Sequence, residues 1–296
     1  MAYSKKKLLR LVAGIPAFPH SIYQLMRITS DINFSPKELI NIIDHDPVLT
    51  LNILKMVNSP YFGFSQSIGS INQAVVCAGI NTIKNLALSL APLELLSSKN
   101  REVPALNQLL IHSLATGSIA KKLARNLGVP ETDATDYFVG GLLHDVGKVA
   151  LFKAIPKKYG KIFKKAAFGE VPLEILEKKA LGLNHNDVGN LLAKRWNLPA
   201  DVRYCMGGYR GRAKENKNSQ MLACVQAADL IATRLDFGYS GAFEIADDLP
   251  VKLQERFGKS LNELIISLGV ISDEINKTRM IIQLKRPKEG GGGSLS

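Results

Sequence analysis

The chain has 296 residues, of which 46% are hydrophobic and 22% are charged; these fractions exclude a disordered chain and allow a large buried core. Three widely spaced cysteines without a Cys-x-x-Cys pair exclude a disulfide framework and a zinc ribbon, so we expect a cytoplasmic protein. The formal net charge is +12, and no apolar run reaches the roughly 18 residues that a membrane span needs, so no membrane association is expected.

Capping signals predict helices in the first hundred residues. Ser35 and Asp46, each followed by proline, and Ser70 are capping residues that precede apolar helical periods. Gly79 is expected to close the helix that Ser70 begins, and a further helix is expected over about 81–96. Alternation typical of strands is scarce, so no sheet is expected.

Longer helical periods follow a polar connection at 97–104. Helices are expected over about 105–126, 134–145, 172–181, 185–196 and 219–235, and around 261–268. The predicted fold class is therefore all-α, with two packed helical lobes. The expected divisions are an N-terminal helical lobe over 1–100, a second helical lobe over 101–240, a C-terminal helical extension over 241–289 and a flexible glycine-rich tail over 290–296.

The dipeptide His144-Asp145 ends the apolar helix expected over 134–145. An imidazole and a carboxylate are costly to bury there without partners, and a Zn, Fe or Mn ion would satisfy both. The same dipeptide also occurs as His45-Asp46, where Asp46 is explained as a helix cap before a proline. The dipeptide alone is therefore a weak signal of a metal site.

Three further polar residues fall on apolar helical stripes. These are His112, His185 and Asp229, and polar groups that face a core must be paired. For any single one, the simplest interpretation is a hydrogen-bonded core residue. Taken together, His112, His144, Asp145 and Asp229 have the residue types of a four-ligand metal site built from three helices.

Positive charge is concentrated in two stretches. From Lys148 to Lys165 there are seven lysines and no acidic residue, and a second basic stretch runs over 203–217. Such clusters attract phosphates, nucleic acids or acidic partners, but they also occur on solvated faces that keep a protein soluble. No interleaved aromatic residues accompany the lysines, so nucleic acid is not the expected partner. An anionic ligand at Lys153–Lys165 is the retained hypothesis.

The order His…His-Asp…Asp resembles the HD phosphohydrolase superfamily, and the flanking motifs resemble its HDOD domain more specifically. Stretches similar to the first half of that domain are 46–49, 57–62 and 68–71, and stretches similar to its second half are 112–115, 140–148 and 196–199. The resemblance covers about residues 12–235.

The resemblance implies a bacterial signal-transduction module that is not an enzyme and acts through contacts with a partner protein. It also implies that His112, His144, Asp145 and Asp229 hold a single divalent metal ion, such as Fe, Mn, Zn or Ni. The alternative is a metal-dependent phosphohydrolase acting on a nucleotide or phosphate ester, in which Lys148 would serve in catalysis by neutralising a phosphate oxygen.

The same resemblance argues against a second metal. Related cyclic-diguanylate phosphodiesterases carry a His-His pair where this chain has Gly207-Gly208. His185 matches another second-site or outer ligand, but His185 and Asp145 alone are too few protein ligands. Two-metal hydrolysis is therefore not expected.

Overall fold

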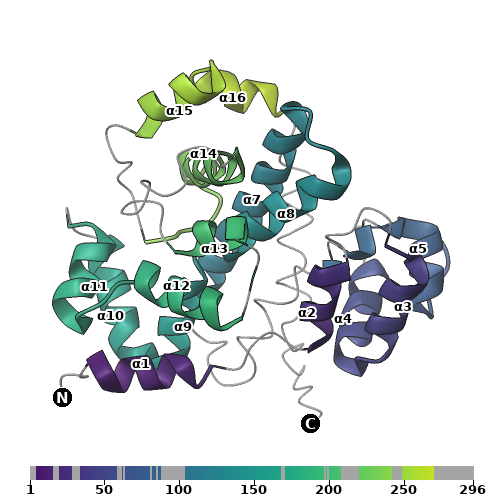
Figure 1. The fold of residues 1–296 in the computed structure, drawn as a ribbon, viewed down its shortest axis with the longest axis horizontal. Coiled ribbons are helices and arrows are strands. Elements are labelled where there is room, and N and C mark those ends of the chain that lie inside the picture. Colours follow the sequence, from purple (N-terminus) through teal and green to yellow (C-terminus); the bar gives the residue numbers. More distant parts are fainter. Residues whose placement is uncertain are drawn as a thin grey trace, which may run out of the picture.

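The structure is a computed structural model, and every regular element in the part of the chain that it describes is a helix (Figure 1), which confirms the all-α prediction. The residues described are 5–15, 20–28, 34–58, 62, 64–80, 82–84, 86–87, 104–167, 171–196, 198, 200–207, 220–241 and 249–269. The predicted helix over 81–96, the connection at 97–104 and the boundary between lobes near residue 100 fall wholly or mostly outside them, and so does the tail over 290–296.

In chain order, an early set of helices is followed by a later set, with the labels of Figure 1. The early helices are α1 (Lys5–Ala13), α2 (His20–Ile28), α3 (Pro36–Asp44), α4 (Pro47–Val57) and α5 (Ile71–Ala78). The later helices are α7 (Pro104–Asn126), α8 (Glu131–Leu143), α9 (Val146–Ala154), α10 (Pro156–Ala167), α11 (Leu173–Leu181), α12 (His185–Arg195), α13 (Ala200–Met206), α14 (Gln220–Arg234), α15 (Leu249–Phe257) and α16 (Leu261–Ser267). The five long helices expected after residue 104 and the one near 261–268 are confirmed.

Packing does not follow chain order throughout. Helices α2 to α5 pack on one another on one side of the molecule, whereas α7, α8 and α14 form the centre of the other side (Figure 1). Helix α1 packs against α9 and α12, so the first helix of the chain lies with the later group. Helices α15 and α16 cover α14. No helix among the described residues has the length and apolar character to span a membrane.

The capping residues of the early helices act as the sequence predicts. The Ser35 hydroxyl accepts a hydrogen bond from the Lys37 backbone, and Ser70 accepts one from that of Gln73. Gly79 ends α5 with φ 84°, a left-handed conformation that favours glycine. Local sequence alone therefore sets the ends of these helices.

A close crossing of α7 and α8 depends on two glycines. A Cβ on Gly141 would lie 2.7 Å from the Gly117 Cα, and a Cβ on Gly117 would lie 2.8 Å from the Phe138 carbonyl oxygen. Side chains at these positions would force the helices apart. The crossing matters for the site because His112 and His144 lie close to it on the two helices.

A buried lysine lies where the early helices approach α8. Lys84 is 0% exposed, and its ammonium lies 5.4 Å from the centre of the Phe34 ring. Its charge also acts on Asp136 in α8. Burial raises the pKa of Asp136 to about 6, although Lys84 partly opposes the shift. This carboxyl therefore titrates in a range where an exposed aspartate is already ionised.

Candidate metal centre

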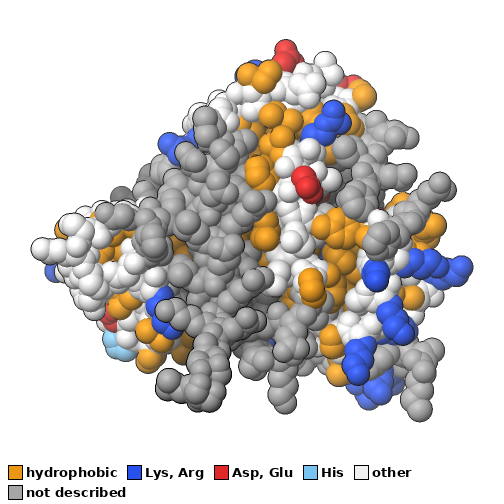
Figure 2. Space-filling model, turned by 180° about the vertical axis from the view of Figure 1, so that it is seen from behind, with side chains coloured by type: hydrophobic (Ala, Val, Ile, Leu, Met, Phe, Trp, Pro, Cys, Tyr) orange, Lys and Arg blue, Asp and Glu red, His pale blue; other side chains and the backbone are white. Residues whose placement is uncertain are grey.

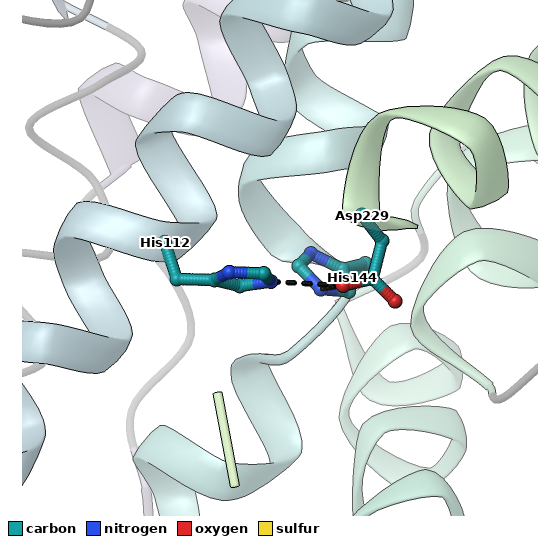
Figure 3. A group of neighbouring side chains, drawn as sticks. All are labelled: His112, His144 and Asp229. Atoms are coloured by element: carbon teal, nitrogen blue, oxygen red, sulfur yellow. Dashed lines mark hydrogen bonds and ion pairs between the residues drawn. The ribbon is translucent and has the colours of Figure 1, made fainter. Parts of the chain in front are cut away.

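Three helices bring two imidazoles and a carboxylate to one point (Figure 3). His112 comes from α7, His144 from the end of α8 and Asp229 from α14, and one potential ligand atom of each lies within 4.8 Å of those of the others. The His112 Nε2 donates to Asp229 Oδ1 at 2.9 Å, and the His144 Nε2 lies 3.8 Å from that same oxygen. Residues 112 and 229 are 117 positions apart, so only the packing of α7 on α14 joins them.

Asp145 adds a second carboxylate beside His144. Its Oδ2 lies 3.4 Å from the His144 Nε2 and accepts a hydrogen bond from the Lys148 ammonium at 2.7 Å. Asp145 occupies the N-cap position of α9, yet its side chain makes no capping hydrogen bond. The carboxylate is directed to the centre instead. Three of the predicted ligands, His112, His144 and Asp229, thus share one point, and Asp145 adjoins it through His144, with Lys148 against it; their assignment as metal ligands remains a prediction.

The tautomer of His144 follows from its neighbours. Its Nδ1 donates to the Gly141 backbone carbonyl at 2.6 Å, which leaves Nε2 as the lone-pair nitrogen of the neutral ring. This buried Nε2 has no hydrogen-bond partner, and neither does the buried Nδ1 of His112. A lone pair that faces two carboxylates is unfavourable unless a cation, either a proton or a metal ion, lies between them.

The electrostatics of the centre agree with this conclusion. Burial alone would lower the pKa of His144, but Asp145 and Asp229 outweigh it and raise that pKa. Burial alone would raise the pKa of Asp145, but His144 and Lys148 hold it well below its usual value. The pKa of Asp229 is likewise lowered against the effect of burial, by the hydrogen bond from His112 and the charge of His144. Two ionised carboxylates against the Lys148 ammonium leave one negative charge, which either a protonated His144 or a bound cation would neutralise.

These donors fit a divalent metal ion. Imidazole nitrogens and carboxylate oxygens are ligands that Zn, Fe and Mn accept, and a backbone carbonyl commonly holds the second nitrogen of a ligating histidine, as Gly141 holds His144. The observation that supports the fit is the buried His144 Nε2, which lacks a hydrogen-bond partner. The structure does not distinguish among these metals.

His185 lies in a different cluster. Its Nδ1 donates to Glu177 Oε2 at 2.7 Å, its backbone N–H donates to the same oxygen at 2.9 Å, and the Tyr159 hydroxyl donates to Glu177 Oε1 at 2.5 Å. Its Nε2 is 4.0 Å from Glu174 Oε1. His185 begins α12 because Asn184 and Asp187 form a capping box there. Its expected role as an outer or second-site ligand remains a prediction.

Sequence reasoning missed Glu177, the hub of this second cluster. The carboxylate is 0% exposed, whereas a glutamate in a lysine-rich helix is usually solvated. A signal was available, because Leu173, Glu177 and Leu181 recur at four-residue spacing and all three are buried. Glu177 and Tyr159 therefore join α10, α11 and α12 through hydrogen bonds.

Of the two glycines that stand where related phosphodiesterases carry a His-His pair for a second metal, the structure describes one. Gly207 follows α13, and a Cβ there would lie 3.5 Å from the Asn190 Cβ, whereas Gly208 lies outside the described residues.

The fold divides the seven-lysine stretch. Lys148 of α9 is buried in the centre, whereas Lys153 of α9 and the five lysines of α10 lie away from it. The basic stretch over 203–217 is described only to residue 207.

Comparisons with known proteins agree with the motif resemblance. A family model described as the HDOD domain matches residues 15–207. An uncharacterized protein of Treponema pallidum (strain Nichols) is 29% identical over 191 residues, which is 64% of this chain and only 36% of that relative. This chain thus matches about a third of the length of that relative.

Solved structures share the fold. An HDOD domain protein with unknown function from Geobacter sulfurreducens has a TM-score of 0.73 and 23% identity, covering 94% of this chain and 98% of that one. A protein of Shewanella amazonensis SB2B named "Putative phosphohydrolase" has a TM-score of 0.69 and 22% identity, covering 93% and 97%. A Marinobacter aquaeolei VT8 protein named "Putative signal transduction protein" has a TM-score of 0.72 and 14% identity, covering 95% and 65%.

Proposed function

The chain belongs to the HDOD domain family, and from that premise we propose that it is a bacterial, cytoplasmic regulatory module that binds a partner protein and does not hydrolyse phosphate esters. On this proposal the His-Asp centre joins helices, and one divalent metal ion held by His112, His144, Asp145 and Asp229 strengthens the junction.

Burial of the centre is the observation that carries the proposal. His112, His144, Asp145 and Lys148 are 1%, 4%, 4% and 5% exposed, and only the Asp229 side chain, at 17%, is half-buried among these residues. A phosphate ester must place its phosphorus beside an activated water, and a catalytic metal keeps a position open for that purpose. Side chains this deeply buried favour a structural role over turnover.

The ion pair of Asp145 supports the same conclusion. Lys148 is the residue that would neutralise a phosphate oxygen in a hydrolase, yet its ammonium donates to Asp145 Oδ2 at 2.7 Å. The ammonium thus compensates a carboxylate of the protein itself. Because both side chains are buried, parting them to admit a substrate would cost several kcal/mol, on the order of 3–5.

A bound metal would supply Lewis acidity in a hydrolase, but here we assign it a cross-linking role. Its four protein ligands come from α7, α14 and the α8–α9 junction, so binding would favour the folded arrangement over any state in which those helices separate. A partner whose binding moved any of these helices would therefore lower the affinity of the centre for the metal.

An activity screen tests the proposal. The full chain, supplied with Mn²⁺ or Fe²⁺, is assayed on cyclic dinucleotides, nucleoside triphosphates and phosphomonoesters, beside Asp145→Asn. The control is Asp44→Asn, an exposed aspartate at the end of α3. We expect the parent chain, Asp145→Asn and Asp44→Asn to give the same background rate, with no turnover above it. Turnover lost in Asp145→Asn and kept in Asp44→Asn would refute the proposal.

The second candidate function is a mononuclear metal-dependent phosphohydrolase. The observation that favours it is the contact of Lys148 with Asp145, one of the four candidate ligands, together with a fold shared with a protein named as a phosphohydrolase. In that case Lys148→Met would abolish turnover while the metal content stayed close to one ion per chain. Elemental analysis and the activity screen on the same samples separate the two functions.

A further inference from the structure

Cationic side chains of three neighbouring helices gather at one end of the molecule. We call this surface the basic face. In Figure 2 the Lys and Arg side chains gather at the lower right, over the end that holds α1 and α9 to α11 in Figure 1. Both α1 and α10 pack against α9. The basic face consists of Lys6, Lys7, Arg10, Lys153, Lys157, Lys158, Lys161, Lys164 and Lys165.

The tertiary structure changes the cluster that the sequence suggested. Lys148 is removed from it, because it is buried against Asp145. Helix α1 is added, although its sequence lies more than a hundred residues away. Neither α1 nor α10 contains a single acidic residue, so no carboxylate within either helix offsets the lysines.

The placement of these lysines opposes helix stability. Helices α1 and α10 both have lysines in the first turn and no acidic residue there. The amino end of a helix carries partial positive charge, so each such lysine costs roughly 0.3–1 kcal/mol. Folding does not explain this arrangement, whereas binding of an anionic partner does, since the lysines attract it.

The apolar side of α10 is committed to the core. Tyr159 and Phe163 are buried, and their ring centres lie 4.7 and 5.1 Å from that of Phe152. Helix α10 therefore cannot turn over to insert into a bilayer, and it has no exposed aromatic ring on which a nucleic-acid base would stack. What it presents to a partner is a fixed row of lysines.

We propose that the basic face binds an acidic segment of a partner protein, an inference that rests on the proposed function as a regulatory module. Eight of the nine cations are lysines and only Arg10 is an arginine, whereas recognition of phosphates favours the planar arginine fork. Leu11 lies beside Arg10 in α1 and is 40% exposed. It offers an apolar contact that a phosphodiester backbone would not use.

The test measures binding of the full chain to a fluorescein-labelled peptide of glutamates with interspersed leucines. A peptide with glutamine in place of glutamate is the matched probe. The variant Lys157→Glu/Lys161→Glu reverses two charges of the basic face. It is expected to fold because both lysines are exposed and an acid at position 157, in the first turn of α10, is favourable. The control variant Lys37→Glu/Lys55→Glu reverses two exposed lysines of α3 and α4.

We expect the glutamate peptide to bind with an affinity that falls as salt rises, and the α10 variant to bind at least about tenfold more weakly. The control variant should bind like the parent, and Leu11→Ser should weaken the peptide several-fold. Equal losses in both double variants, or no binding, would overturn the inference. So would tighter binding to duplex DNA or to phosphatidylglycerol vesicles at the same ionic strength. Phosphoesterase activity removed by Asp145→Asn would refute the proposed function without changing these results.

Discussion

The dipeptide His-Asp occurs twice in this chain, each time between two helices, and its aspartate is used differently in the two places. His45-Asp46 joins α3 to α4, and His144-Asp145 joins α8 to α9. Both histidines direct Nδ1 to a backbone carbonyl of the preceding helix, at 2.7 Å and 2.6 Å. Both aspartates stand at the N-cap position of the helix that follows. The histidines are therefore placed alike, but the aspartate backbones differ, since Asp46 before Pro47 is extended (φ −116°, ψ 97°) and Asp145 is not (φ −102°, ψ 13°).

The carboxylates are used differently. Asp46 Oδ1 accepts hydrogen bonds from the backbones of Val48 and Leu49, so it caps α4 at the surface. Asp145 caps nothing and instead contacts His144 and Lys148 in the interior. The extended backbone before Pro47 suits Asp46 to capping. Asp145 lacks that backbone and becomes a candidate ligand because packing surrounds it with charged groups and withdraws it from water.

The largest expected effect comes from truncating the two aspartates. Asp145→Ala leaves the buried Lys148 ammonium without its carboxylate, so we expect a loss of about 4 kcal/mol in the free energy of unfolding. Asp46→Ala removes a cap and the acceptor for the Ser21 hydroxyl, with an expected loss of about 1–2 kcal/mol. Urea unfolding measures both, and equal losses would contradict the comparison.

Removal of metal is the next largest effect. If a metal present at about a hundred times its dissociation constant holds the centre, EDTA should lower the stability by about 3 kcal/mol and lower the Tm. Asp229→Asn should abolish this response, because it removes a candidate ligand, whereas Asp46→Asn should keep it. Thermal unfolding with and without EDTA gives the readout. A Tm that EDTA leaves unchanged in the metal-loaded parent would exclude the cross-linking role.

A mutation away from the centre should disturb it through the helix crossing. Gly141→Ala places a Cβ against the Gly117 backbone, so we expect a loss of about 2 kcal/mol and a lower metal content. Gly160→Ala in α10 is the control, because the nearest atom that its Cβ would meet is Phe152 Cε1 at 3.9 Å. Denaturation and elemental analysis of both variants decide whether the crossing positions His112 against His144.

The smallest effect concerns Asp136, a half-buried carboxyl outside the centre. Its pKa of about 6 in the folded protein exceeds the unfolded value of 3.8, so its contribution to stability is present at low pH and is lost as the pH rises from about 4 to about 6. Asp136→Asn removes this dependence. The stability of the variant relative to the parent should therefore rise by about 1–2 kcal/mol from pH 4 to pH 7. A difference that is flat with pH would contradict the raised pKa.

Helices with strong local signals were predicted well. Those begun by Ser35, Asp46 and Ser70 and the long helices after residue 104 have clear caps or long apolar periods. The short helices α1, α2, α9, α10, α13 and α15 were not predicted as helices. Helix α10 shows why, since it carries many lysines, a glycine and no acid in its first turn, and its packing against α9 and α11 supplies the stability.

The candidate site was only partly predictable. His112, His144, Asp145 and Asp229 were identified by residue type, by inward-facing stripes and by family resemblance, and they lie together. The separate cluster of Tyr159, Glu177 and His185 was not foreseen, because hydrogen bonds between distant helices leave little trace in local periodicity. The sequence likewise could not show that the ammonium of Lys148 pairs with Asp145.

The sequence by itself determined the all-α class, the helix ends and the set of polar residues that face the core, because these depend on neighbours within a few residues. The tertiary structure alone brought His144 against His112 and Asp229 and Lys148 against Asp145, whereas the proline after Asp46 already marked the other His-Asp dipeptide as a cap. It also brought α1 beside the lysines of α10. The physical reason is that burial and long-range charge contacts arise from the packing of whole helices, whereas caps and periodicity arise within each helix.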